Sequence, residues 1–244
     1  MKSIALTDVG ARRSMNQDAV FAMDQRIGAL PNLFIVCDGM GGENAGDYAS
    51  KRCLEVVVDE VERSTASKPV EIFEQAIQAA NRIIYEEAAA DSSKHGMGTT
   101  LVAASVIDGR LFVANVGDSR LYVAGATKLN QITNDHSVVA ELVRTGELKA
   151  EAARTDKRKN MITRAIGAES RVMADYFDVN LHGNDRVLLC SDGLTNMVED
   201  RDILSILTSS DTLDNKASRL IELANNNGGK DNISVILIED FVEG

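Results

Sequence analysis

Short apolar runs, rich in β-branched side chains, recur along this chain and predict β-strands. Two of these runs flank Asp108-Gly109, a dipeptide typical of a tight turn, so the sequence predicts a β-hairpin over residues 101–116. The predicted strands cover residues 20–23, 33–37, 101–107, 111–116, 121–124, 172–179, 187–190 and 233–238.

Apolar positions at helical spacing predict three helices. One carries an apolar stripe from Ile72 to Ile84, with Pro69 suited to its first turn. The others cover residues 47–62 and 212–225, and Gly228 is expected to stop the last one. Since paired strands alternate with helices without strict βαβ order, we expect an α+β fold. It would be an antiparallel β-sandwich flanked by pairs of helices, four α-β-β-α layers forming a single domain over residues 1–244.

Composition narrows the class of protein. Hydrophobic residues make up 44 % of 244, with no Trp and few aromatics, so Val, Ile, Leu and Ala must build the core. The net charge of -11 argues against nucleic acid or an anionic membrane as partner. Three cysteines predict neither a disulfide framework nor a zinc site. With no apolar run long enough for a signal peptide or membrane span, we expect a cytoplasmic protein.

Aspartates stand at the ends of several predicted strands. Asp38, Asp192 and Asp118 follow strands, whereas Asp18 and Asp231 precede them. Each could simply cap a turn, where Asp is common. If the strands bring these side chains to one edge, however, the carboxylates cannot all ionise without compensating charge. Hard cations with oxygen ligands would supply it, which favours Mg²⁺ or Mn²⁺ over Zn²⁺.

Several short motifs, in order along nearly the whole chain, resemble those of one family. These segments are Thr7-Asp8-Val9-Gly10, Arg13 with Asn16-Gln17-Asp18, Asp38-Gly39-Met40-Gly41-Gly42, Gly96-Met97-Gly98-Thr99-Thr100, Gly117-Asp118-Ser119-Arg120, Asp135-His136-Ser137, Thr163-Arg164-Ala165-Ile166-Gly167, Ser191-Asp192-Gly193 and Gly228-Gly229-Lys230-Asp231-Asn232. In these segments the sequence resembles bacterial members of the PPM family, the PP2C-type serine/threonine phosphatases.

The resemblance implies two tightly held cations, Mn²⁺ or Mg²⁺. Asp38 would bridge them, and the Gly39 carbonyl would bind the second. Asp192 and Asp231 would complete the first, while Asp18 would hold metal-bound water from outside the ligand shell.

Two further residues have implied roles. Arg13 would clamp the substrate phosphate, a task that suits its planar guanidinium, although Arg12 is a neighbouring competitor. Asp118, with the free oxygen of Asp192, would hold a third and weaker cation. The alternative is that Asp118 is only the ion-pair partner of Arg120.

The implied activity is hydrolysis of phosphoserine and phosphothreonine in proteins by a metal-activated water. The enzyme would be a monomer that acts on phosphorylated proteins and reverses a bacterial Hanks-type Ser/Thr kinase. The polar stretch 137–160, with short helical pieces, resembles the family's flap, with a passive surface excursion as the alternative. Two other functions stay open: a phosphoprotein-binding pseudophosphatase, and a phosphatase of a small phosphorylated metabolite.

Two residues depart from the family pattern. Gln17 stands where many relatives have Glu, which removes a possible charge near the second metal. Met40 stands where eukaryotic relatives carry a histidine assigned as general acid, and a thioether has no proton to donate.

Overall fold

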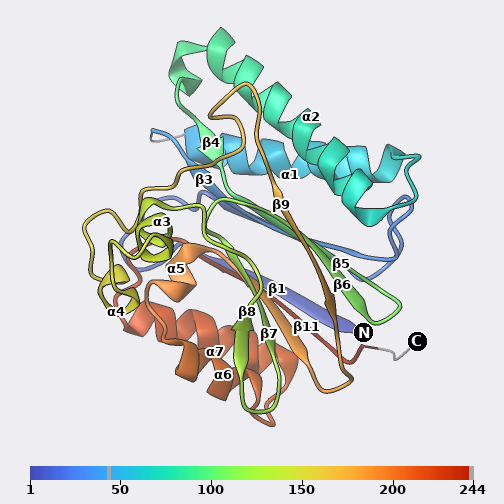
Figure 1. Cartoon of the computed structure of the whole chain (residues 1–244), viewed down its shortest axis with the longest axis vertical. Helices are drawn as coiled ribbons and strands as arrows, with labels where there is room; N and C mark the ends of the chain where they lie inside the picture. Colours follow the sequence, from blue (N-terminus) through green and yellow to red (C-terminus); the bar gives the residue numbers. More distant parts are fainter. Residues whose placement is uncertain (43–44, 242–244) are drawn as a thin grey trace.

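Two antiparallel β-sheets lie face to face at the centre of the molecule (Figure 1). The computed structural model describes residues 1–42 and 45–241, so residues 43–44 and 242–244 of the expected domain lie outside the described residues. One sheet has the order β1 (Lys2–Asp8), β11 (Ile233–Glu239), β10 (Arg186–Cys190), β7 (Arg120–Ala124) and β8 (Leu129–Gln131). The other has the order β2 (Asp18–Met23), β3 (Leu33–Met40), β5 (Leu101–Ile107), β6 (Arg110–Val116) and β9 (Asp175–Asn180), with β4 (Gly98–Thr99) paired to β3.

Pairs of helices cover the outer faces of both sheets (Figure 1). Helices α1 (Ala45–Arg63) and α2 (Pro69–Ala90) lie on the β2–β3–β5–β6–β9 sheet. Helices α6 (Asp200–Leu207) and α7 (Leu213–Asn226) lie on the other. The α+β fold and the antiparallel sandwich with flanking helices are therefore confirmed, as is the 101–116 hairpin, in which Leu101 pairs with Val116.

Alternation along single strands explains why the central runs are apolar throughout. In β3, Leu33, Ile35 and Cys37 pack toward α1 and α2, whereas Phe34 and Val36 pack between the sheets. Strands β10 and β11 divide their side chains in the same way between α6/α7 and the space between the sheets. A strand buried on both faces needs no polar alternation, and its position is fixed by packing from two directions.

The structure also contains elements that the apolar pattern did not predict. Strands β1, β4 and β8 and helix α6 were not predicted, and neither were the single turns η1 (Ser92–Lys94) and α5 (Asp192–Thr195). The strand predicted over 172–179 is wrong at its start, because β9 begins at Asp175. The Val172 carbonyl instead accepts a hydrogen bond from the Gln78 side chain at 2.8 Å.

The stretch 137–160 contains two short helices, α3 (Val138–Arg144) and α4 (Ala150–Ala153). The Ser137 hydroxyl caps α3 by accepting a hydrogen bond from the Ala140 N–H at 3.2 Å. Among the helices of the described residues, none combines the length and apolar composition needed to cross a membrane.

Candidate active site

The topology brings the predicted aspartates to one edge of the sandwich. Asp18 at the start of β2 lies opposite Asp38 near the end of β3 in the strand register. Asp192 follows the end of β10 after Ser191, and Asp231 precedes β11 by two residues, with Asn232 between them. Strands β10 and β11 are neighbours in the other sheet. Asp118 lies in the turn between β6 and β7. These five positions come from both sheets, as convergence at one edge requires.

Electrostatics show that the five carboxyl groups influence one another. Burial raises the pKa of Asp38 well above its usual range, and the charges of Asp18, Asp192, Asp118 and Asp231 raise it further. Burial and the nearby Asp231 charge likewise raise the pKa of Asp192 to about 6, against the opposing charges of Arg120 and Lys159. Neutral protein groups cannot balance the negative charge of this cluster. Either a bound cation must neutralise it, or some of the carboxyl groups must be protonated.

Asp18 is held rigidly beneath the edge. Its Oδ2 accepts hydrogen bonds from the hydroxyls of Ser191 at 2.8 Å and Ser234 at 2.7 Å. Its Oδ1 is buried and has no hydrogen-bond partner among the described residues. Burial raises the Asp18 pKa to about 7, although both hydroxyls oppose the shift. A fixed carboxylate with one unused oxygen is suited to accept a hydrogen bond from a water molecule.

Two other carboxylates have direct polar partners. Asp231 Oδ2 accepts a hydrogen bond from Arg13 Nη2 at 2.8 Å, which places the guanidinium at the acidic edge. Asp192 Oδ2 accepts one from Asn196 Nδ2 at 2.8 Å, within the turn of α5. Among the described residues, the side chain of Arg12, the competitor of Arg13, forms no ion pair with the acidic residues of this edge. The geometry thus places the Arg13 guanidinium, and not that of Arg12, at the acidic edge.

The alternative prediction, an ion pair between Asp118 and Arg120, is wrong: among the described residues these two side chains form no ion pair. The Arg120 guanidinium binds Asp135 instead, with Nη2 to Oδ2 at 2.7 Å and Nε to Oδ1 at 2.9 Å. Burial and the charges of Asp192 and Asp135 raise the Asp118 pKa to about 8, and Arg120 opposes this only in part. Asp118 is 9 % exposed, and among the described residues no cationic side chain forms an ion pair with its carboxylate.

Gly39 has a steric reason to be glycine. A Cβ there would lie 2.0 Å from the Gly46 carbonyl oxygen, so the start of α1 could not pack against β3. The Gly39 N–H donates to the Gln17 carbonyl at 3.0 Å, and the carbonyl of Gly39 lies beside Gly46. Met40 follows on the same strand, paired with Gly98.

The donor chemistry of this edge suits a hard divalent cation. The converging groups are carboxylates, and Asp18 retains an unused buried oxygen. Among the described residues, no three acidic, histidine or cysteine side chains already gather into a ready-made set for one ion. Arg13 and Asn196 hold two of the carboxylates, so binding a cation there requires these contacts to be exchanged for metal bonds.

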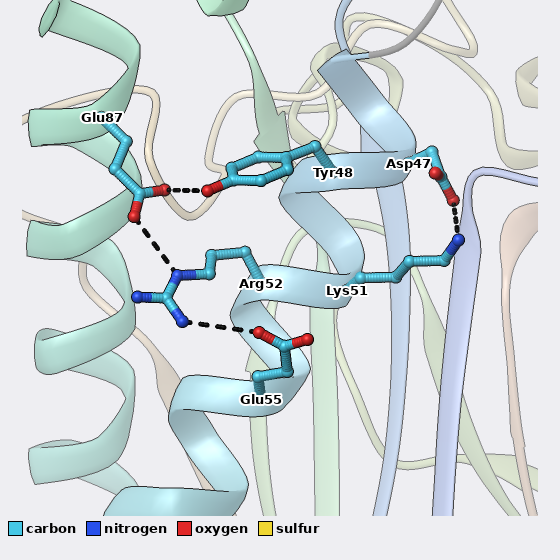
Figure 2. Close-up of a pocket in the computed structure, with 6 residues that line it drawn as sticks. All are labelled: Asp47, Tyr48, Lys51, Arg52, Glu55 and Glu87. Carbon is cyan, nitrogen blue, oxygen red and sulfur yellow. Dashed lines mark hydrogen bonds and ion pairs between the residues drawn. The ribbon is translucent and has the colours of Figure 1, made fainter.

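A separate pocket of about 420 Å³ lies between α1 and α2 (Figure 2). It is lined by Asp47, Tyr48, Lys51, Arg52, Glu55 and Glu87. Each charged side chain of its lining has a partner of opposite charge: Lys51 pairs with Asp47 at 2.7 Å, and Arg52 pairs with Glu87 at 3.3 Å and Glu55 at 3.4 Å (Figure 2). We therefore assign no catalytic role to this pocket.

Several residues that organise the edge were not predicted to have a role. They are Ser191 and Ser234, which hold Asp18, together with Asn196, which holds Asp192, and Asn232. The available signal was their position beside predicted ligands, in Ser191-Asp192 and Asp231-Asn232. Small polar residues are so common in turns that this signal alone predicts nothing specific.

An acidic, all-oxygen edge on a helix-flanked sandwich fits a metal-dependent hydrolase. Comparison with known proteins identifies the family, because the model described as protein phosphatase 2C matches residues 9–233. The chain belongs to the protein phosphatase 2C family.

Similar proteins agree over nearly full length. The serine/threonine phosphatase stp of Listeria monocytogenes is 43 % identical, with 96 % of this chain and 93 % of that protein covered. The protein phosphatase PhpP of Streptococcus pneumoniae is 38 % identical, with 98 % and 97 % covered. The crystal structure of the serine/threonine phosphatase Stp1 from Staphylococcus aureus superposes with a TM-score of 0.93 at 36 % identity, covering 100 % of this chain and 95 % of that one.

A further solved structure bears on the metal. It is the catalytic domain of the serine threonine protein phosphatase PstP in complex with two manganese ions, 33 % identical, with a TM-score of 0.84 and 97 % and 96 % of the two chains covered. The predicted family, enzyme class and fold are thus confirmed, and the family is metal-dependent.

Proposed function

We propose that this protein hydrolyses phosphoserine and phosphothreonine in other proteins, using the acidic edge as its active site. The observation that carries the proposal is the mutual charge influence among five buried or half-buried aspartates drawn from both sheets. Such a cluster is costly unless it binds cations, and a phosphate ester is the substrate that cations and an arginine bind together. Its relatives include one named serine/threonine phosphatase stp and one named protein phosphatase PhpP.

The residues have distinct proposed roles toward the metal. Asp38, the Gly39 carbonyl, Asp192 and Asp231 would hold two Mn²⁺ or Mg²⁺ ions, with Asp18 supporting from outside the ligand shell. Bound there, the cations would supply a nucleophile at neutral pH and stabilise negative charge on the phosphoryl group. The unused Asp18 Oδ1 would accept a hydrogen bond from water at the site and so orient it.

Asp118 would hold a third, weaker cation together with Asp192. Support comes from its raised pKa of about 8 and from the engagement of Arg120 by Asp135 instead. Few protein ligands imply weak binding, with water completing the coordination shell.

Arg13 would bind the substrate phosphate. Its Nη2 reaches the Asp231 carboxylate at 2.8 Å, and a bound phosphate would compete with Asp231 for the same guanidinium. Met40 cannot protonate the leaving alkoxide, so that proton would come from water or from another group.

The wider setting is also part of the proposal. We infer a single monomeric domain in the cytoplasm whose 137–160 flap, with α3 and α4, influences protein substrates. The substrates would be phosphorylated proteins, including a Ser/Thr kinase and its targets.

Hydrolysis of phosphopeptides tests this function. Purified protein with Mn²⁺ should release phosphate from phosphoserine and phosphothreonine peptides with higher kcat/KM than from small phosphorylated metabolites. Binding without turnover would support a pseudophosphatase, and a preference for a metabolite would make the natural substrate a small molecule.

A further inference from the structure

The loop that joins β1 to β2, residues 9–17, carries Arg13 at its centre. The Arg13 side chain is 48 % exposed and has one polar partner among the described residues, the Asp231 carboxylate. A long, half-exposed side chain is poorly fixed by its own contacts. The position of its guanidinium therefore depends on how firmly the loop backbone is held.

One buried side chain ties both ends of this loop. Asn232, 4 % exposed, donates hydrogen bonds from Nδ2 to the carbonyls of Val9 and Met15, both at 2.9 Å. Its Oδ1 accepts one from the Gln17 N–H at 2.8 Å. Both amide hydrogens and the carbonyl oxygen are thus used, and every partner belongs to the loop that carries Arg13.

The turn at residues 228–232, which contains Asn232, also holds the loop at its middle. The Gly229 carbonyl accepts hydrogen bonds from the N–H groups of Ala11 at 2.9 Å and Arg12 at 3.1 Å. Gly10, with φ +80°, packs so closely that a Cβ would lie 2.1 Å from the Asp231 carbonyl oxygen. The loop is therefore mounted on the 228–232 turn, the segment that also presents the Asp231 carboxylate.

We propose that Asn232 is a positioning residue that sets where the Arg13 guanidinium lies relative to Asp231. This inference rests on the proposed role of Arg13 in binding phosphate. Because Asn232 adjoins Asp231 in sequence and spans both ends of the Arg13 loop, it fixes the distance between the phosphate-binding arm and the acidic edge. A small displacement of a group that orients substrate can reduce catalysis strongly.

A matched control is available elsewhere in the fold. Asn32 is also 4 % exposed, and its side chain bonds the Val106 backbone twice at 2.7 Å. It also accepts from the Ser105 hydroxyl. Its partners lie in β5 and none belongs to the Arg13 loop, so Asn32→Ala removes a comparable buried network without touching Arg13.

The test is a double-mutant cycle in the full-length, Mn²⁺-loaded enzyme. We expect Asn232→Ala to lower kcat/KM for p-nitrophenyl phosphate by about 10- to 100-fold, mainly by raising KM. In an Arg13→Ala background the same change should cost less than about twofold, because the residue it positions is gone. Asn32→Ala should change kcat/KM by the same factor in both backgrounds.

Two measurements separate positioning from general damage. Hydrogen exchange of the amides in residues 11–13 should accelerate in Asn232→Ala and not in Asn32→Ala, and calorimetric Mn²⁺ binding should stay at the parental affinity. If Asn232→Ala fails to fold, Asn232→Ser serves instead, since its hydroxyl reaches at most one of the three partners.

Equal losses from Asn232→Ala with and without Arg13, or parental kinetics in the single variant, would overturn the inference. Lost Mn²⁺ affinity would also overturn it, by making Asn232 a support of the metal site. Parental kinetics in Arg13→Ala alone would instead refute the role of Arg13 in the proposed function. This single variant is therefore measured before the Asn232 variants.

Discussion

Replacing Asp118 with Asn should stabilise the protein at pH 8 when EDTA removes divalent cations. The carboxyl group of Asp118 is buried, and its pKa is raised to about 8 by burial and by the charges of Asp192 and Asp135. In the unfolded chain the same group titrates near 3.8. Between these values the folded protein must keep a proton that the unfolded chain has released.

The sign and size of the stability change follow from the difference between the pKa of Asp118 in the folded and unfolded states. A raised carboxyl pKa leaves full stability below pH 3.8 and removes it progressively as pH rises to about 8. The rise corresponds to a gross cost of about 6 kcal/mol at pH 8. The charges of Asp118 and Asp192 interact, so protonation of one carboxyl group makes the other easier to ionise. The observed destabilisation is therefore smaller than this gross cost. Burying the Asn amide costs about 1–3 kcal/mol in return.

We therefore expect a net gain of at least about 2 kcal/mol at pH 8, or about 4 °C or more in Tm. At pH 5 the cost of Asp118 is only about 2 kcal/mol, which the buried amide cancels. Thermal unfolding by circular dichroism at pH 5, 6, 7 and 8 in EDTA measures both limits. The control is Glu222→Gln, which removes an exposed carboxylate from α7 and should leave Tm nearly unchanged.

A Tm for Asp118→Asn that equals the parent's at pH 8, or a gain of the same size at pH 5, would refute this reasoning. With saturating Mn²⁺ the gain should shrink or reverse, because cations neutralise the cluster in the parent and stabilise its folded state.

Four further outcomes are expected. EDTA should abolish hydrolysis of p-nitrophenyl phosphate and Mn²⁺ restore it, while Asp38→Ala and Asp231→Ala should lose nearly all turnover yet stay folded by circular dichroism; full activity after chelation would contradict the metal assignment. Arg13→Ala should lower kcat/KM without loss of Mn²⁺ binding, as calorimetry can check. Asp118→Asn should keep the tight Mn²⁺ sites but flatten the rate increase at millimolar Mn²⁺, and an unchanged titration would leave Asp118 without a metal role. Exchanging residues 137–160 for a relative's segment should change phosphoprotein preference more than activity on an aryl phosphate, and equal effects would make the flap a structural element only.

The sequence predicted the elements whose burial comes from two directions. Strands β3, β10 and β11 are apolar throughout because helices cover one face and the opposite sheet covers the other. Strand β1 is an edge strand with polar residues and only partial burial, and its order comes from antiparallel pairing with β11 at the far end of the chain. No local pattern records such a partner, so edge strands of this kind stay hidden.

The site likewise contains residues that the sequence could predict and contacts that it could not. Asp38, Asp192 and Asp231 could be predicted because each adjoins a strong apolar strand. The partner of Arg120 could not, since nearness in sequence suggested Asp118 and the fold supplies Asp135. Gly117, with φ +102°, turns the chain just before Asp118. Side-chain pairing across a turn depends on backbone direction, which residue types alone do not specify.

The cost of the acidic cluster and its capacity to bind cations have one physical origin. Asp38 and Asp192 stand at the ends of strands packed from both faces, so these carboxylates cannot separate without breaking core contacts. Burial, together with repulsion that the scaffold cannot relax, raises the pKa of Asp38 and Asp192. The free energy that a bound cation recovers by neutralising these carboxylates adds to its binding. Substitutions that relieve the repulsion, such as Asp118→Asn, should therefore raise the stability of the chelated protein while weakening its response to Mn²⁺. Stability and metal affinity should change in opposite directions across a series of such variants. This is expected where a functional site retains a cluster of carboxylates that destabilises the metal-free fold.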